Sequence, residues 1–196
     1  MAQVLKQSIR KLIVDKATLI FSSEGYHGAT VSMIAAQAKV AVGTVYTYFP
    51  SKLHLLYAVY RPWLEARMDE VAKASDAATS PRAKIKAILL GLWRDTPTQN
   101  PGLANSLMQA LASADPGKGK IEPLLRWNEQ RLIEILAKAL PRSRRRYADD
   151  LVANVLLMAY DGYVINRRLG DLRDYDKLAE IVADLLLGRS DNGKGG

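Results

Sequence analysis

The sequence predicts an all-α protein with a small N-terminal domain of three helices and a larger, wholly helical C-terminal domain. Three observations support this fold class. Apolar residues recur at helical spacing in one segment after another, and proline and glycine separate these segments. No stretch alternates apolar and polar residues as a half-buried strand would. Two short helical patterns between residues 30 and 49 are joined by a turn of only a few residues, which is the layout of a helix-turn-helix.

The N-terminal helix is expected over residues 4–24, followed by Gly25 in the left-handed conformation that a helix end favours. The second helix begins at Thr30, whose hydroxyl can accept a hydrogen bond from a free backbone N–H of the first turn. The third begins near Val42 and ends before Pro50. The side chains expected in the core of these two helices are Val31, Ile34, Ala35, Ala38, Val45 and Phe49.

The same segment resembles a known family. Several short motifs stand in the order and at the spacing found in the TetR-like bacterial transcription regulators: Ile34-Ala35, Gly43-Thr44-Val45-Tyr46, Tyr48-Phe49, Ser51-Lys52 and Leu55-Leu56. The match covers the first part of the chain, and beyond it the resemblance is one of helical layout. It implies a helix-turn-helix DNA-binding domain over residues 1–56, with the second motif helix in the major groove of double-stranded operator DNA.

The expected DNA contacts divide into phosphate binding and base reading. Three hydroxyls and one positive charge are expected at phosphates, from Thr30, Thr44, Tyr48 and Lys52. The start of the second motif helix is expected to read bases, through Val42, Gly43, Thr44 and Thr47. Tyr46 matches an aromatic position of the family that either touches DNA or braces the helix.

Two residues depart from the family pattern. Lys39 stands where these proteins usually have glycine in the turn, so it either adopts a positive φ at some cost or the turn differs. Val42 stands where a polar or basic residue is common; a valine can pack against a thymine methyl but cannot donate to guanine. The base preference of a relative therefore does not transfer to this chain.

Composition and charge narrow the classes of function. The chain has 196 residues and no cysteine, which excludes disulfides, thiolate nucleophiles and cysteine-based zinc sites. His27 and His54 form no pattern that indicates catalysis or a metal, so we predict neither an enzyme nor a cofactor. The net charge is +8, and residues 1–60 carry six basic and two acidic side chains, an excess that favours a polyanionic partner. No apolar run reaches the roughly 18–20 residues of a membrane span, so a cytoplasmic protein without membrane contact is expected.

The rest of the chain is predicted to be helical. A long helix is expected from Lys52 to about residue 74, bent or broken near Pro62, and further helices over residues 82–95, 103–114, 121–140, 147–169 and 175–187. Residues 57–189 are assigned to a helical effector-binding and dimerisation domain. Residues 190–196 are assigned to a disordered tail.

The family resemblance implies that a small molecule binds this C-terminal domain and loosens the grip on DNA. The candidate lining residues are Trp93, Met108, Trp127, Asn128, Met158, Asp161, Tyr163 and Asn166. Tryptophan and methionine at helical spacing are more often plain core, whereas the three polar residues need partners on otherwise apolar helices. A largely apolar or aromatic effector follows, and the sequence does not specify its identity.

The last two helices are apolar on more than one face, which indicates a homodimer because such a helix must be covered all round. The interface residues expected there are Leu156, Tyr163, Leu178 and Leu185. The sequence thus predicts a ligand-responsive repressor that binds a palindromic operator as a homodimer. The alternative is a helix-turn-helix DNA-binding factor without a small-molecule effector, either architectural or regulated by a partner.

Overall fold

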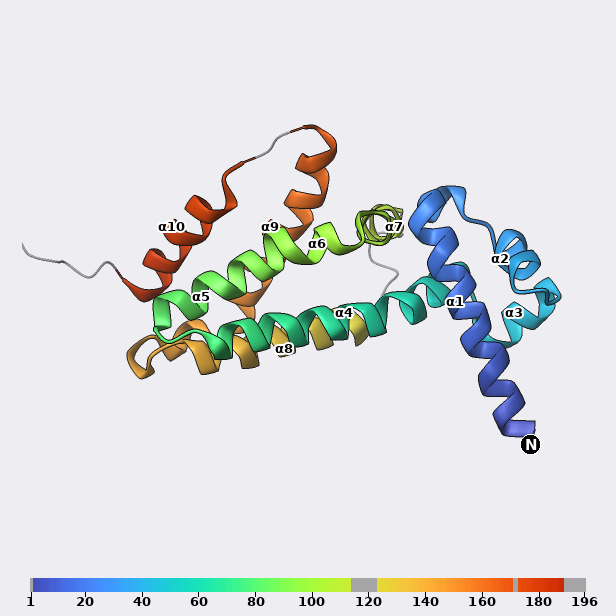
Figure 1. Cartoon of the computed structure of the whole chain (residues 1–196), viewed down its shortest axis with the longest axis horizontal. Coiled ribbons are helices and arrows are strands. Elements are labelled where there is room, and N and C mark those ends of the chain that lie inside the picture. Colours follow the sequence, from blue (N-terminus) through green and yellow to red (C-terminus); the bar gives the residue numbers. More distant parts are fainter. Residues whose placement is uncertain (1, 114–122, 171–172, 189–196) are drawn as a thin grey trace, which may run out of the picture. The chain divides into compact units, whose positions relative to one another are not determined.

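The computed structural model describes residues 2–113, 123–170 and 173–188, and every regular element in these ranges is a helix (Figure 1). In chain order the elements are α1 (Ala2–Gly28), α2 (Val31–Gln37), α3 (Val42–Tyr48), α4 (Lys52–Ala77), α5 (Pro81–Leu90), the π-helix η1 (Gly91–Asp95), α6 (Thr96–Gln99), α7 (Pro101–Ala112), α8 (Pro123–Ala139), the 3-10 helix η2 (Arg142–Tyr147), α9 (Asp150–Arg168) and α10 (Tyr175–Leu187). The predicted all-α fold class is confirmed.

Local chemistry at the helix ends follows the sequence closely. Thr30 accepts a hydrogen bond from the backbone N–H of Met33 at 3.1 Å and caps α2. Gly25 adopts φ +71°, which interrupts α1 three residues before its end. Lys39 adopts φ +53°, so the first of the two alternatives holds: the lysine takes the positive φ itself, in a strained backbone conformation. The helix α4 continues through Pro62.

The chain divides into two compact units, described here one at a time. Unit 1 comprises residues 1–65 and 100–124, and unit 2 comprises residues 66–99 and 125–196. The boundary expected after Leu56 does not coincide with this division. The reason is that α7 packs along α1 and so joins the N-terminal helices. The loop expected over residues 115–120 and the tail expected over residues 190–196 lie outside the described residues.

Unit 1 has a core built by α1, α2, α3, the start of α4 and α7. The predicted core residues of α2 and α3 are buried, Val45 and Phe49 among them. Polar contacts fix α7 on α1, since the Ser106 hydroxyl donates to the carbonyl oxygen of Phe21 at 2.7 Å. Gly102 lies so close to α1 that any β-carbon there would overlap the carbonyl oxygen of Ser22. Close approach of the two helices therefore requires glycine at this position.

Unit 2 packs α5 against α10, which lie beside each other (Figure 1). Its core holds fully buried apolar side chains of α5 and α8, among them Ile85, Leu89 and Leu132. Two ion pairs also join α5 and α10 at the exposed edge of their contact, Arg82 with Asp184 at 2.9 Å and Lys86 with Glu180 at 2.9 Å. Exposed pairs of this kind each add about 0.2–1 kcal/mol. Burial of the apolar faces is therefore the main source of stability. Among the described residues, no helix has the length and apolar character to cross a membrane.

Candidate nucleic-acid interface and effector region

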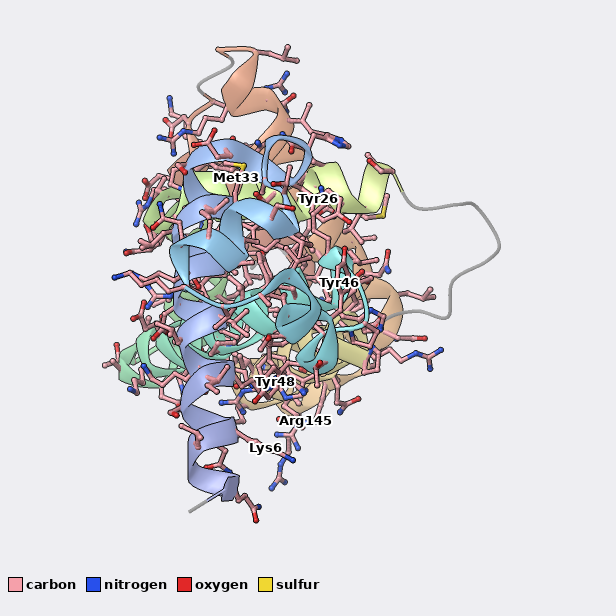
Figure 2. All side chains as sticks on the ribbon, turned by 90° about the vertical axis from the view of Figure 1, so that its right-hand side faces the viewer. Lys6, Tyr26, Met33, Tyr46, Tyr48 and Arg145 are labelled. Carbon is pink, nitrogen blue, oxygen red and sulfur yellow. The ribbon has the colours of Figure 1, made fainter. Side chains whose placement is uncertain are left out.

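The exposed face of α3 carries the residues predicted to read bases. Val42 is 38% exposed and Tyr46 is 49% exposed, although both are large apolar or aromatic side chains. Gly43 is exposed, and a β-carbon there would meet no atom within 4 Å. Figure 2 shows Tyr46 and Tyr48 on different sides of α3. Because Val45 of the same helix is buried, α3 presents one face to the core and leaves the other open to a groove.

The hydroxyl groups predicted to contact DNA differ in whether their proton is already used in a hydrogen bond within the chain. Thr47 donates to the carbonyl oxygen of Gly43 at 3.0 Å, so its proton is used within α3. Thr30 uses its oxygen as a helix cap and keeps its proton for an acceptor outside the chain. Thr44 and Tyr48 are half-buried on the same helix. A phosphate oxygen is an acceptor only, so Thr30 is better suited to it than Thr47.

Lys52, expected at a phosphate, lies in an internal cluster. Its ammonium group donates to the carbonyl oxygens of Tyr26 at 2.8 Å and Ala29 at 3.1 Å. The same nitrogen lies 4.3 Å from the centroid of the Tyr26 ring. Burial lowers the pKa of Lys52. Two of the three N–H groups thus tie the start of α4 to the end of α1 and to Ala29, which follows it.

The eight residues expected to line an effector pocket are distributed over both units. Met108 belongs to α7 in unit 1, and the others belong to unit 2. Trp93 is buried and its indole N–H donates to the carbonyl oxygen of Leu156 at 2.9 Å. Met158 is 63% exposed on the outer side of α9. Trp127 and Asn166 are half-buried. Within unit 2 these side chains therefore differ widely in exposure, from the buried Trp93 to the exposed Met158.

Three polar groups of this region have informative surroundings. The Asn128 side-chain oxygen is buried and accepts no hydrogen bond from the described residues. Burial raises the pKa of Asp161 to about 6, and no ion pair with a described residue offsets the effect. Tyr163 is buried, its ring stands edge-on to Tyr175 at 4.8 Å, and its hydroxyl accepts from Arg167 at 3.3 Å. Asn128 and Asp161 remain candidates for contact with a ligand, whereas Tyr163 already has partners.

A cavity of about 500 Å³ opens in unit 2 between α4, α5, η1 and α6. Its lining includes Arg67, Val71, Leu90 and Arg94, and none of the eight expected residues belongs to it. The π-helix forms one side of this cavity, and sequence periodicity gives no sign of it because a single turn is too short to establish a period of its own.

Comparison with known proteins shows which family the helix-turn-helix matches. The model of the family described as bacterial regulatory proteins, tetR family, matches residues 13–59, which span the helix-turn-helix. The HTH-type transcriptional repressor KstR of Mycolicibacterium smegmatis is 25% identical over 186 residues, which are 94% of this chain and 90% of that protein. Over residues 13–59 the chain matches the TetR family, and along most of its length it is similar to a repressor of that family.

Two solved structures are similar to the chain over more than nine-tenths of its length. The fatty acid degradation regulator FadR from Bacillus halodurans matches with a TM-score of 0.66 and 25% identity, covering 93% of this chain and 96% of that chain. The transcriptional regulator FadR from Bacillus subtilis, solved in complex with stearoyl-CoA, has a TM-score of 0.62 and 22% identity, covering 91% and 97% of the two chains. At 22% identity, the similarity to the Bacillus subtilis structure shows a shared fold and nothing more.

The structure adds one basic residue next to the end of α3 that sequence reasoning left out. The guanidinium of Arg10 lies 5.1 Å from the centroid of the Phe49 ring, at the end of α3. Its side chain is exposed, so the charge stands beside the reading helix. The sequence shows Arg10 as one of several basic residues of α1, and only its position over the Phe49 ring distinguishes it from the rest.

Proposed function

We propose that this protein is a repressor that binds a palindromic operator as a homodimer and leaves the operator when a small, largely apolar effector binds its C-terminal helices. The observation that carries the proposal is the combination of an open α3 face in unit 1 with an uncovered apolar face in unit 2. The first suits a DNA groove and the second suits another copy of the chain. Two reading helices held in this way reach half-sites about 34 Å apart, one turn of the double helix.

The open face of α3 supports sequence-specific binding. Val42 is the first residue of α3 and has no polar group, so its contact with a base is with a thymine methyl. Val42→Ala is expected to relax the preference at one base pair, while affinity for random DNA stays unchanged. Binding to an operator series with single substitutions measures this. Equal weakening for operator and random DNA would show that Val42 does not read a base.

The outer face of α9 supports the homodimer. Leu151, Val155, Met158, Ile165 and Leu169 are all more than half exposed and alternate at spacings of four and three residues, with Gly162 filling the remaining place in the series. This is the spacing of a helix that packs along a second helix through one seam. Exposed apolar rows of this length mark contact surfaces in soluble proteins.

α10 extends the same proposal. Leu185 is 72% exposed and Ile181 is 57% exposed, whereas Leu178 is half-buried. Leu156 and Tyr163, which the sequence placed at the interface, are instead buried within unit 2, at 3% and 8% exposure. They support the fold of one protomer, so they are not used to test the interface.

Sedimentation of two glutamate variants tests the interface. Leu185→Glu is expected to separate the dimer and leave the helical content unchanged, because it places a charge on a face that is open in the protomer. Leu156→Glu is expected to unfold unit 2, because it places a charge in the core. A Leu185→Glu protein that sediments like the wild type at micromolar concentration would contradict the interface.

The effector part of the proposal rests on linkage. The relative solved with stearoyl-CoA holds a ligand with a long apolar chain, which supports an apolar effector for this chain as well. A ligand releases DNA only if it binds the DNA-free state more tightly, and couplings of about 1–3 kcal/mol correspond to roughly 5- to 150-fold in affinity. The test is titration of one ligand with and without operator DNA. Equal affinities would exclude induction by that ligand.

A further inference from the structure

The cavity of unit 2 has an unusual wall. Five residues, Gly91–Asp95, form a π-turn, and such turns are frequent at functional sites. A β-carbon on Gly91 would stand 2.8 Å from a methyl group of Val71, so the π-helix and α4 touch at this point. Beyond the contact the two helices leave a space of about 500 Å³. This volume is within the range of small-molecule sites.

One donor in this wall has no acceptor. Arg67 lines the cavity, and its side chain is 17% exposed. Its terminal nitrogen Nη2 donates to the Glu70 carboxylate at 2.7 Å. Its Nε–H is buried and donates to no acceptor among the described residues. A ligand oxygen placed in the cavity next to Arg67 would satisfy this donor.

The charges around the cavity determine whether a charged or an uncharged ligand oxygen is favoured there. Two guanidinium groups, of Arg67 and Arg94, and two carboxylates, of Glu70 and Asp95, line it, so their charges cancel. Arg94 is held by Asp95 at 2.7 Å and by Asp176 at 3.2 Å. No positive charge is left over for an anionic ligand, and Glu70 would repel a carboxylate placed at the free N–H of Arg67.

The remaining lining favours an apolar body. Val71 and Ala74 of α4 face this space together with Ala87 and Leu90 of α5. These side chains offer no hydrogen bonds, so the rest of a bound molecule gains by being apolar. A ligand that fits both parts has one hydrogen-bond acceptor without charge and a short hydrocarbon chain.

We propose that this cavity binds an uncharged carbonyl compound with a short apolar chain, an ester, thioester or ketone, whose carbonyl oxygen accepts the hydrogen bond of Arg67 Nε–H. The proposal rests on the effector-responsive function proposed above and adds the site and the chemistry of the ligand. Because Arg67 and Val71 belong to α4, which begins at Lys52 directly after the reading helix, occupancy of the cavity acts on the helix that enters unit 1.

Calorimetric titration of the full chain with two matched probes tests the proposal. Methyl octanoate carries a neutral carbonyl and octanoate carries a carboxylate on a chain of similar length. Methyl octanoate is expected to bind saturably, with one site per chain, and octanoate is expected to bind at least about 10-fold more weakly. Arg67→Met is expected to weaken methyl octanoate by about 10-fold or more, the loss typical of a hydrogen bond to a charged donor.

Two further variants complete the design. Arg61→Met is the matched control, because Arg61 also lies on α4 and pairs with Glu65 at 3.1 Å, but it does not line the cavity. It is expected to bind methyl octanoate like the wild type. Ala87→Leu fills the cavity without touching the polar wall and is expected to abolish binding.

Several results would overturn the proposal: no saturation with methyl octanoate up to its solubility limit, equal or tighter binding of octanoate, or unchanged affinity in Arg67→Met or Ala87→Leu. Binding of operator DNA without probe is measured in the same preparations. Loss of probe binding with intact operator binding overturns the cavity alone. Absence of operator binding in the wild type overturns the proposed function, while the probe titration still decides the chemistry of the cavity.

Discussion

Replacement of Lys52 by methionine separates an internal role of this lysine from a role at the DNA backbone. Methionine keeps most of the hydrocarbon volume and removes the charge and all three N–H groups. In the structure the ammonium group donates to the carbonyl oxygens of Tyr26 and Ala29 and lies over the Tyr26 ring. The variant leaves both carbonyl oxygens without this donor.

The size of the effect follows from these contacts. A hydrogen bond with a charged partner contributes about 1.5–3 kcal/mol, and an exposed cation–π contact contributes about 0.5–1 kcal/mol. Lys52 is half-buried, and burial lowers its pKa, which shows that desolvation opposes the contacts. Two such hydrogen bonds and the ring contact sum to about 3.5–7 kcal/mol, and desolvation offsets part of this, so we expect Lys52→Met to lower the free energy of unfolding by about 2–3 kcal/mol.

Urea unfolding and the salt dependence of operator binding measure the two roles. For an internal role, stability falls as stated, and the slope of log affinity against log salt changes by less than one unit. Lys11→Met is the matched control, because Lys11 pairs with Asp15 at 2.9 Å on the exposed side of α1 and is expected to change stability by less than about 1 kcal/mol. Unchanged stability together with a slope flattened by about one unit would refute the internal role and assign Lys52 to a phosphate.

Three further predictions concern stability. Gly102→Ala, which forces a β-carbon onto the Ser22 carbonyl, is expected to cost about 1–3 kcal/mol in urea unfolding, whereas Gly43→Ala, with open space around it, is not; equal effects would contradict the close contact of α7 with α1. Lys39→Gly relieves the left-handed strain and is expected to stabilise by up to about 1 kcal/mol, seen as a raised Tm, while Lys39→Val lowers it; a lower Tm for the glycine variant would show that the lysine is not strained. The folded chain raises the pKa of Asp161 to about 6, so as pH rises Asp161 loses its proton in the unfolded chain before it does in the folded one, and the free energy of unfolding falls between about pH 4 and 6. Asp161→Asn should remove this pH dependence and raise the free energy of unfolding by roughly 1–2 kcal/mol at pH 7. Parallel pH profiles for the two proteins would contradict this prediction.

Local features of this protein could be predicted from the sequence because the interactions that decide them span only a few residues. The cap at Thr30 reaches three residues along the chain, and the left-handed conformation at Gly25 depends on one residue. The positive φ of Lys39 was one of two predicted alternatives for the same reason. The spacing of Val45 and Phe49 likewise predicted their burial, because the period of a helix fixes which residues share a face.

The faces of the C-terminal helices could not be assigned in the same way. α9 is apolar nearly all round, so its pattern does not distinguish the side that packs inside unit 2 from the side left open. Leu156 and Val155 are neighbours in the chain, yet Leu156 is 3% exposed and Val155 is 63% exposed. The packing of α9 on the π-helix, where the Trp93 indole donates to the carbonyl oxygen of Leu156, accompanies the burial of Leu156 and has no counterpart in the sequence pattern.

The sequence by itself determined the helical fold, the helix-turn-helix and the basic charge of the N-terminal part, since each follows from local pattern and composition. Only the tertiary structure decided the partners of Lys52, which lie 23 and 26 residues away, and the docking of α7 on α1 across about eighty residues. Only the tertiary structure, too, leaves the Nε–H of Arg67 buried beside a cavity without an acceptor among the described residues. The physical reason is the same in each case: a hydrogen bond or a cavity depends on atoms that folding brings together, and their separation along the chain leaves no periodic signal.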